Sequence, residues 1–391
     1  MMKKLLAAAL LICMLLSCAS AATYTTPDGR TVILSLGGSF AYSRDTQGVI
    51  RVWGDNQFGQ LGRGHTSQSL KIFEFRTKNA ELDTSKLLDV VTGSDYSFMW
   101  LEDGTLWGAG NNSYRSFAAK GSAYGTHQKV AIPGKPAALA PGFGHVLLLT
   151  EDGDVYSWGR GSEYQLGTGA RKHTATPAKV AVENIVQIAA GGKFCLALDA
   201  DGQLWGWGDN AFQQLSPDAK TKHVKAPIRI DTGDIDIAYI EACGSSVVLL
   251  DTQGTLWTWG CNTHQQLGYD TKGKTTNAPM AVPLPLPVKY VAAYSSQTYA
   301  ILEDGSLWSW GNNSYGQLGQ GFRSSASEGV LPGKCWDKDV VLVQGGSLFC
   351  IAMLEDGTLL SAGISKFGQQ GEGGSKSKYT LSPNGMDLIL D

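Results

Sequence analysis

One segment of the sequence matches a phosphate-binding loop letter for letter. Residues 268–275 read Gly-Tyr-Asp-Thr-Lys-Gly-Lys-Thr, a pattern in which backbone amides cradle phosphate groups and the lysine contacts them. That chemistry requires a buried strand that leads directly into a helix. Proline excludes a helix interior, and four prolines follow soon after: Pro279, Pro283, Pro285 and Pro287. We therefore interpret the segment as a loop and predict no nucleotide cofactor.

Other residues that could support catalysis or hold a metal are scattered along the chain. No two of the six histidines have the spacing of metal ligands: His65, His127, His145, His173, His223 and His264. No Gly-x-Ser-x-Gly nucleophile motif occurs. A site assembled from distant segments would leave no linear trace. From the residues alone we predict that the protein is not an enzyme and holds no metal or cofactor.

A unit of sequence repeats along the whole chain. One regular copy is residues 303–311, which read Glu-Asp-Gly-Ser-Leu-Trp-Ser-Trp-Gly. Intervals of 56, 49, 49, 52, 51 and 52 residues separate the seven final glycines, Gly54, Gly110, Gly159, Gly208, Gly260, Gly311 and Gly363. Repeats of about fifty residues that encode four short strands are typical of propeller blades. We predict an all-β, seven-bladed β-propeller with four-stranded blades.

Each unit carries the signals of antiparallel hairpins. Asp-Gly pairs such as Asp201-Gly202 favour tight turns, because glycine tolerates positive φ. The acidic residues Asp199 and Asp201, like those in 151–154, are explained by these turns. In the strand 204–207, Leu-Trp-Gly-Trp, the two rings point to one face of the sheet. Runs of small residues such as 188–192 suit the innermost strands, which crowd around the propeller axis.

The two ends of the chain suggest how the ring closes. Residues 31–36 read as the inner strand of the first unit, and residues 386–390 could supply a missing strand. An open sheet edge is a liability, and pairing the two ends would remove it. We expect the N- and C-terminal strands to close one blade together.

The unit and its tail, residues 310–319 (Trp-Gly-Asn-Asn-Ser-Tyr-Gly-Gln-Leu-Gly), resemble the regulator of chromosome condensation repeat. Residues 53–62 match as closely. The resemblance covers nearly the whole chain after its first segment, and it implies a seven-bladed propeller. Units two and seven have Ala109 and Ala362 in place of the motif tryptophan, so we expect those blades to be the least regular.

The resemblance implies three functional precedents. Eukaryotic members act as exchange factors for the GTPase Ran, a role that an exported chain could not perform. A plant member senses ultraviolet light through Gly-Trp-Arg-His-Thr motifs, and these are absent here. A secreted bacterial member inhibits β-lactamases through one rim of its propeller, and this precedent matches the compartment inferred below.

Aligned units expose two sets of equivalent positions. Ring one lies four residues after the motif glycine and comprises Phe58, Tyr114, Glu163, Phe212, His264, Tyr315 and Phe367. Ring two lies thirteen residues before the motif Trp or Ala and comprises Phe40, Tyr96, His145, Phe194, Ser246, Gln297 and Phe349. One interpretation is packing within each blade. The other is that rim aromatics anchor a partner, for which we take Phe58, Tyr114, Phe212, His264, Tyr315 and Phe367 as candidates.

The first residues indicate export. Lys3 and Lys4 precede an apolar run that is too short to span a bilayer, and small residues follow. Cleavage after Ala21 would give a signal peptide of residues 1–21 and a single propeller domain of residues 22–391. A lipobox-like sequence ending at Cys18 offers the alternative of a leader of residues 1–17 and a lipid anchor. Spacing assigns no disulfide among Cys195, Cys243, Cys261, Cys335 and Cys350.

The charge of the chain limits its partners. A formal net charge of -3 gives no footprint for nucleic acid or an anionic membrane. A local basic cluster at Lys220, Lys222, His223 and Lys225 is either solvated surface or a contact for an acidic partner. We predict a monomeric, extracytoplasmic scaffold whose rim loops bind a protein. The alternatives are a secreted inhibitor of an exported enzyme and, less favoured, a carbohydrate-active or lyase enzyme on a propeller frame.

Overall fold

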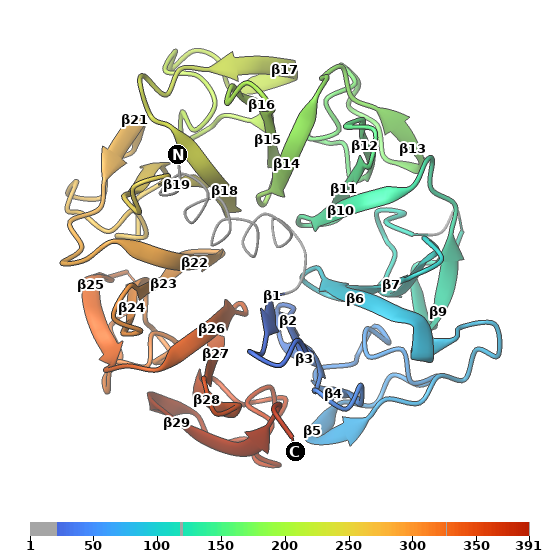
Figure 1. The fold of residues 1–391 in the computed structure, drawn as a ribbon. Coiled ribbons are helices and arrows are strands. Elements are labelled where there is room, and N and C mark those ends of the chain that lie inside the picture. The colour runs from blue at the N-terminus through green and yellow to red at the C-terminus, as the bar shows by residue number, and fades with distance from the viewer. Residues whose placement is uncertain (1–21, 118–119, 326, 391) are drawn as a thin grey trace.

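The computed structural model describes residues 22–117, 120–325 and 327–390. The regular secondary structure of these residues consists of β-strands and one 3-10 helix, η1 (Thr84–Lys86). The strands form seven sheets that stand in a ring around a central axis (Figure 1). No helix in the described ranges is long and apolar enough to cross a membrane. The predicted signal peptide, residues 1–21 with Cys18, lies outside the described residues.

The strands of the first four blades follow one another from the inner to the outer edge of each sheet. Blade one contains β1 (Ala22–Thr25), β2 (Thr31–Leu36), β3 (Phe40–Arg44), β4 (Ile50–Gly54) and β5 (Ser69–Glu74). Blade two contains β6 (Leu87–Thr92), β7 (Tyr96–Leu101), β8 (Leu106–Asn111) and β9 (Ala123–Val130). Blade three contains β10 (Pro136–Pro141), β11 (His145–Thr150), β12 (Val155–Gly159) and β13 (Thr174–Lys179). Blade four contains β14 (Ile185–Ala190), β15 (Phe194–Asp199), β16 (Leu204–Asp209) and β17 (His223–Ile230).

The remaining three blades have the same order. Blade five contains β18 (Ile237–Cys243), β19 (Ser246–Asp251), β20 (Leu256–Gly260) and β21 (Thr276–Ala281). Blade six contains β22 (Val288–Tyr294), β23 (Gln297–Leu302), β24 (Leu307–Asn312) and β25 (Gly329–Trp336). Blade seven contains β26 (Val340–Gly345), β27 (Phe349–Leu354), β28 (Thr358–Gly363) and β29 (Lys378–Asp387). The predicted propeller of seven four-stranded blades is confirmed.

Antiparallel order gives the propeller two different faces. The connections between the first and second strands and between the third and fourth strands of a blade emerge on one side, which we call the tail-turn face. The Asp-Gly hairpins and the links between blades emerge on the other, the hairpin face. At one such hairpin Asp199 Oδ1 accepts the backbone N–H groups of Asp201 and Gln203, at 3.1 and 2.8 Å. This local bonding explains the aspartate at the turn without any catalytic role.

Buried tryptophans join neighbouring blades. The last tryptophan of the motif is almost fully buried wherever it occurs, and its indole N–H donates to a backbone carbonyl in the tail turn of the preceding blade. In blade four, for example, Trp207 Nε1 donates to the Gln165 carbonyl at 2.9 Å. Equivalent bonds run from Trp53 to Gln369, from Trp158 to Ser116, from Trp259 to Gln214 and from Trp310 to Gln266. A single residue of the repeat therefore fills the gap between two sheets and satisfies a buried carbonyl.

Blades two and seven replace the missing tryptophan with other residues. Tyr42 and Tyr299, from the preceding blades, donate to the carbonyls of Gln60 and Gln317 at 3.0 and 2.9 Å. The space of the indole is filled from the outer strands: His127 and Leu381 lie against the tail-turn glycines Gly62 and Gly319, as Trp207 lies against Gly167. Both blades complete their four strands without the tryptophan.

The prediction that the two chain ends close one blade together is also wrong. β29 pairs with β28 as the outer strand of blade seven, and blade one already has four strands of its own with β1 added beside β2. The repeat boundaries coincide with the blade boundaries, so no strand is missing. The last described residues instead contact the β3–β4 hairpin of blade one, where Thr46 N donates to the Leu388 carbonyl at 2.9 Å and Leu390 N donates to Thr46 Oγ1 at 2.8 Å.

We expect Tyr299→Phe to lower the free energy of unfolding by about 1–2 kcal/mol, because it removes a donor from the buried Gln317 carbonyl and keeps the packing ring. Urea unfolding of the purified protein measures the change. Tyr379→Phe is the matched control, because this ring is 39% exposed on the surface, and its expected effect is within about 0.5 kcal/mol. Equal effects of the two variants would show that the tyrosine does not replace the tryptophan bond.

Candidate functional site

The tail turns on one face of the propeller share a common construction. In six of the seven blades the ring-one residue donates its backbone N–H to the side-chain carbonyl of the glutamine two positions later, as from Phe58 to Gln60 at 3.0 Å. The residue after ring one always has positive φ, which explains the glycine of the family motif at Gly316 and the strained backbone at Tyr164. The turn therefore holds each ring-one side chain in a fixed place.

Ring one lies at the boundaries between blades. Tyr315 is 42% exposed, and the other five candidate anchors, Phe58, Tyr114, Phe212, His264 and Phe367, are half-buried. The glycine next to Phe58 lies against Gly125 of blade two, and Tyr114 lies against Gly144 of blade three. The propeller places one such residue in each blade, so they do not form one cluster. They remain candidates for partner contact, because each presents part of its side chain to solvent.

Ring two is entirely core. All seven of its members are at most 1% exposed, and the aromatic or imidazole rings cover a glycine three residues earlier, as Phe194 covers Gly191. The packing interpretation therefore holds for ring two. His145 Nε2 lies 3.2 Å from Cys195 Sγ, which resembles a catalytic dyad. Burial raises the pKa of Cys195 well above its usual value and lowers the pKa of His145 to about 3, so both groups stay neutral and the thiolate is not formed.

Blades two to four add aromatic rings and cations to the tail-turn face. The Arg160 guanidinium lies 5.1 Å from the Tyr114 ring, and His173 packs edge-on against the same ring at 5.4 Å. One blade further, Arg171 and Lys225 each lie 5.6 Å from the Tyr164 ring. Tyrosine supplies a large contact area at low entropic cost, and both tyrosine and arginine are enriched among the residues that anchor protein interfaces.

Three possible metal ligands meet on the same surface. Glu163, Asp209 and His223 place one ligand atom each within 4.8 Å of one another, although 60 positions separate the first from the last in the sequence. His223 Nδ1 lies 3.7 Å from the Glu163 carboxylate and 3.9 Å from that of Asp209, and Arg171 lies 3.7 Å from Glu163. Burial raises the pKa of Asp209. Because Arg171 already supplies positive charge, we interpret the group as an ion-pair network between blades three and four.

Exposed cations surround this network. The connections on the tail-turn face of blades two to four carry Arg115, Arg171, Lys172, Lys193, Lys220, Lys222 and Lys225, all exposed. We call this region, together with Tyr114, Arg160 and Tyr164, the basic surface. The sequence alone identified only the part from Lys220 to Lys225, because the rest comes from other connections of blades two, three and four. Counting Lys and Arg along the sequence could have identified each basic connection. It could not have shown that these connections lie on the same face of the propeller.

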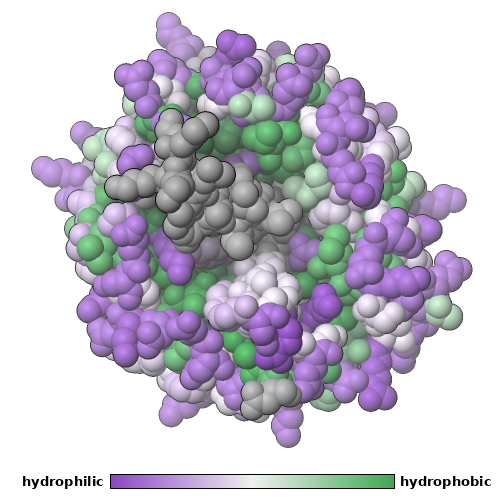
Figure 2. All heavy atoms as spheres, in the orientation of Figure 1, coloured by the Kyte–Doolittle hydropathy of each residue, from purple (hydrophilic) through white to green (hydrophobic). Residues whose placement is uncertain are grey.

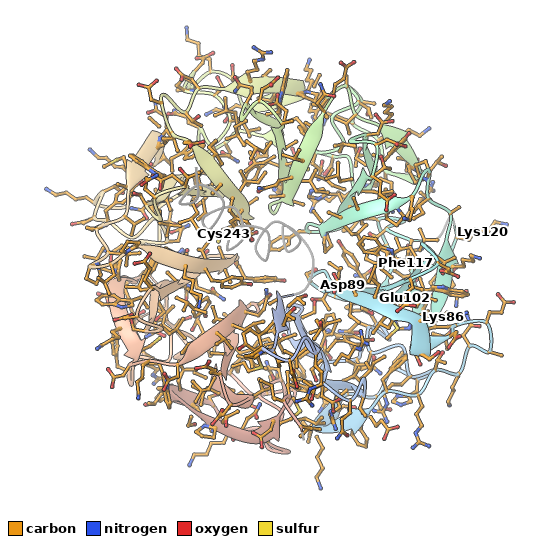
Figure 3. All side chains as sticks on the ribbon, viewed as in Figure 1. Lys86, Asp89, Glu102, Phe117, Lys120 and Cys243 are labelled. Atoms are coloured by element: carbon orange, nitrogen blue, oxygen red, sulfur yellow. The ribbon has the colours of Figure 1, made fainter. Side chains whose placement is uncertain are left out.

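Other predicted features have plain structural explanations. Residues 268–275 form a loop that leads to strand β21, and Gly268 packs against Trp310, so the interpretation of this segment as a loop is confirmed. The cysteines of the described residues are free, and Cys243 lies at the inner end of blade five, near the axis (Figure 3). Lys120, in contrast, lies at the outer edge of blade two, and hydrophilic side chains cover the outer rim of the view in Figure 2.

The chain is similar to several known proteins. It is 27% identical over 360 residues to the ultraviolet-B receptor UVR8 of Arabidopsis thaliana, covering 90% of this chain and 81% of the relative. It is 28% identical over 368 residues to the human E3 ubiquitin-protein ligase HERC2, covering 89% of this chain but only 7% of that much longer protein.

Solved structures share the fold. Yeast RCC1 (Prp20), solved bound to Kap60, superposes with a TM-score of 0.71 at 24% identity over 82% of this chain and 79% of its own. Human WBSCR16 superposes with a TM-score of 0.69 at 24% identity over 80% of this chain and 83% of its own. The sequence model of the RCC1-like domain family matches residues 126–388 of this chain. This match and the seven repeated blades show that the chain belongs to the RCC1-like domain family.

Proposed function

We propose that this protein is an extracytoplasmic binding scaffold that uses its basic surface to hold an acidic protein partner. The observation that carries the proposal is the combination of tyrosines and exposed cations on one face of blades two to four. The surface is mounted on hydrogen-bonded tail turns, so binding would order little backbone. Preorganisation of this kind lowers the entropic cost of association.

The distribution of charge makes the partner's chemistry specific. The basic surface exposes seven Lys and Arg side chains, whereas the chain as a whole has a net charge of -3. Complementary potentials steer a partner to one patch and raise the rate of association. Protein binding also has a precedent in this fold, because yeast RCC1 (Prp20) was solved bound to Kap60. Nothing in that precedent names the partner here.

The compartment follows from the leader. Lys3 and Lys4 followed by an apolar run and small residues direct the chain out of the cytoplasm in this proposal, with or without a lipid anchor at Cys18. Mass measurement of the mature N-terminus distinguishes the two forms. A start at Ala22 gives a freely exported protein, a lipid-modified Cys18 gives an anchored one, and an intact Met1 in fractionated cells contradicts export.

Charge reversal tests the basic surface. The triple variant Lys193→Glu, Lys220→Glu and Lys222→Glu is expected to weaken binding of the crosslinked native partner at least about tenfold, mainly by slowing association. The control variant Lys272→Glu, Lys274→Glu and Lys376→Glu makes the same change of charge at exposed positions of the same face, on blades five and seven. Binding is measured by crosslinking in native cells, identification of the partner, and then surface plasmon resonance at two salt concentrations.

The two variants separate the possible outcomes. A large loss with the first variant and a small one with the control supports the proposal, and so does a fall of affinity with salt. Equal losses would mean that overall charge, not the basic surface, governs binding. An unchanged affinity in both variants would move the interface elsewhere and overturn the assignment.

A further inference from the structure

The axis of the propeller contains a small cavity. Its volume is about 110 Å³, and the inner strands of all seven blades contribute to its wall. Small residues such as Ala140 and Gly191 line the side of blades three and four, whereas blades five to seven contribute Glu241, Tyr290 and Gln344. An engineered cavity of roughly 150 Å³ holds a benzene molecule, so this one suits a ligand of only a few heavy atoms.

Polar contacts occur in two groups on one wall, one within blade five and one between blades six and seven. The Tyr239 hydroxyl donates to Glu241 Oε2 at 2.9 Å, and the backbone N–H of Ala242 donates to Glu241 Oε1 at 3.2 Å. On the neighbouring blades Gln344 Nε2 lies 3.4 Å from the Tyr290 hydroxyl. The two bonds to Glu241 hold its carboxylate in one orientation on the wall of the cavity.

Among the residues that the structure describes, Glu241 forms no ion pair. Burial raises its pKa to about 7, and the same negative charge helps to raise the pKa of Tyr290. A carboxylate that is largely removed from water and has hydrogen bonds but no counter-ion is costly, and a cation in the cavity would offset that cost.

Aromatic rings make up much of the rest of the wall. Tyr239, Tyr290 and Tyr294 line the cavity from blades five and six, and the Phe143 ring of blade three lies 6.1 Å from that of Tyr294. The faces of such rings carry negative potential and attract alkylated ammonium groups. A single carboxylate is a poor site for Ca²⁺ or Mg²⁺, which take several oxygen ligands.

From this arrangement we propose that the axial cavity binds a small alkylammonium cation, with Glu241 as its counter-ion and Tyr239, Tyr290 and Tyr294 around its alkyl groups. This site is separate from the basic surface, which has the opposite charge and lies on the tail-turn face of blades two to four. Either proposal can therefore fail without the other.

Titration calorimetry with tetramethylammonium tests the site in protein expressed with its own leader. We expect one site per chain, with tert-butanol, a neutral molecule of similar size, bound at least about tenfold more weakly. Glu241→Gln keeps the shape and the Tyr239 contact, and it should weaken tetramethylammonium at least about tenfold. Glu102→Gln, the same change at an exposed position, should leave the affinity unchanged.

Two further measurements separate a binding role from a structural one. Tyr290→Phe keeps the aromatic ring and should change the affinity less than Tyr290→Ala. The affinity of the wild-type protein should rise about tenfold from pH 6 to pH 8, because Glu241, with a pKa of about 7, becomes ionised over this range. The neighbouring groups Tyr290, Tyr294 and Cys243 stay neutral there, because burial raises the pKa of each. The Glu241→Gln variant should lose that pH dependence.

Three outcomes would overturn the inference. One is absence of tetramethylammonium binding up to about 10 mM by folded protein. The second is equal affinity of the wild-type and Glu241→Gln proteins. The third is equal affinity for tetramethylammonium and tert-butanol, which would show that the cavity selects by size and not by charge.

Discussion

Trp207→Ala is expected to lower the free energy of unfolding by about 4 kcal/mol, the usual cost of removing a fully buried tryptophan. The ring is 0% exposed and fills the space between blades three and four. Its indole N–H also satisfies the Gln165 carbonyl at 2.9 Å, and alanine would leave that carbonyl with one donor fewer. Because the residue belongs to the repeat, the result would extend to the other motif tryptophans.

Trp205→Ala is the matched control for this variant. The two tryptophans lie two positions apart on the same strand and point to the same face, but Trp205 is only half-buried and packs under Arg229 at 5.2 Å. We expect a loss of about 1–2 kcal/mol, in proportion to the smaller buried area. Urea unfolding, monitored by circular dichroism, measures the free energy of unfolding of both variants. Similar losses for the two variants would contradict the role of the motif tryptophan as the link between blades.

Gly208→Ala is expected to cost about 3 kcal/mol, the second largest effect that the repeat predicts. Gly208 has a φ of +108°, and a Cβ there would lie 2.6 Å from the Lys193 carbonyl oxygen and 2.8 Å from Phe194 Cα. Both contacts are with backbone, which cannot rotate away as a side chain can. All seven motif glycines have φ between +95° and +108°, so the requirement recurs in every blade.

Gly202→Ala separates strain from steric contact. Gly202 is also at positive φ, +80°, but nothing lies within 4 Å of the position of its Cβ. We expect a loss of about 1 kcal/mol from the backbone conformation alone. Thermal and urea unfolding of both variants provide the comparison. If Gly208→Ala proved no more costly than Gly202→Ala, close approach of the two backbones would not explain why every unit of this chain has the motif glycine.

The sequence predicted the architecture because each blade encodes itself locally. Asp-Gly hairpins, alternating strands and a glycine that tolerates positive φ all lie within one unit of about fifty residues. The motif glycine recurs in seven units, and the tryptophan equivalent to Trp207 recurs in five. Both could therefore be recognised without knowledge of any contact. The expectation about the chain ends failed because it assumed a missing strand, whereas β29 follows β28 within the last unit and completes blade seven.

Replacement of the missing tryptophans could not be predicted from one blade. His127 and Leu381 fill the indole space from outer strands, and Tyr42 and Tyr299 supply the hydrogen bond from preceding blades. A hint was present, because tyrosine occupies this position two residues after ring two only in the blades before the two that lack tryptophan. Its meaning depends on which blade is the neighbour and which side of the strand faces it.

The sequence by itself determined the repeat, and with it the seven four-stranded blades, because hairpins and alternation act over short distances. Only the tertiary structure decided which side chains meet. The ring closes through space and gathers Glu163 with His223, and Tyr239 and Glu241 with Tyr290, from different blades. Function in this fold depends on such meetings, since the units supply a frame and the contacts between units supply the sites.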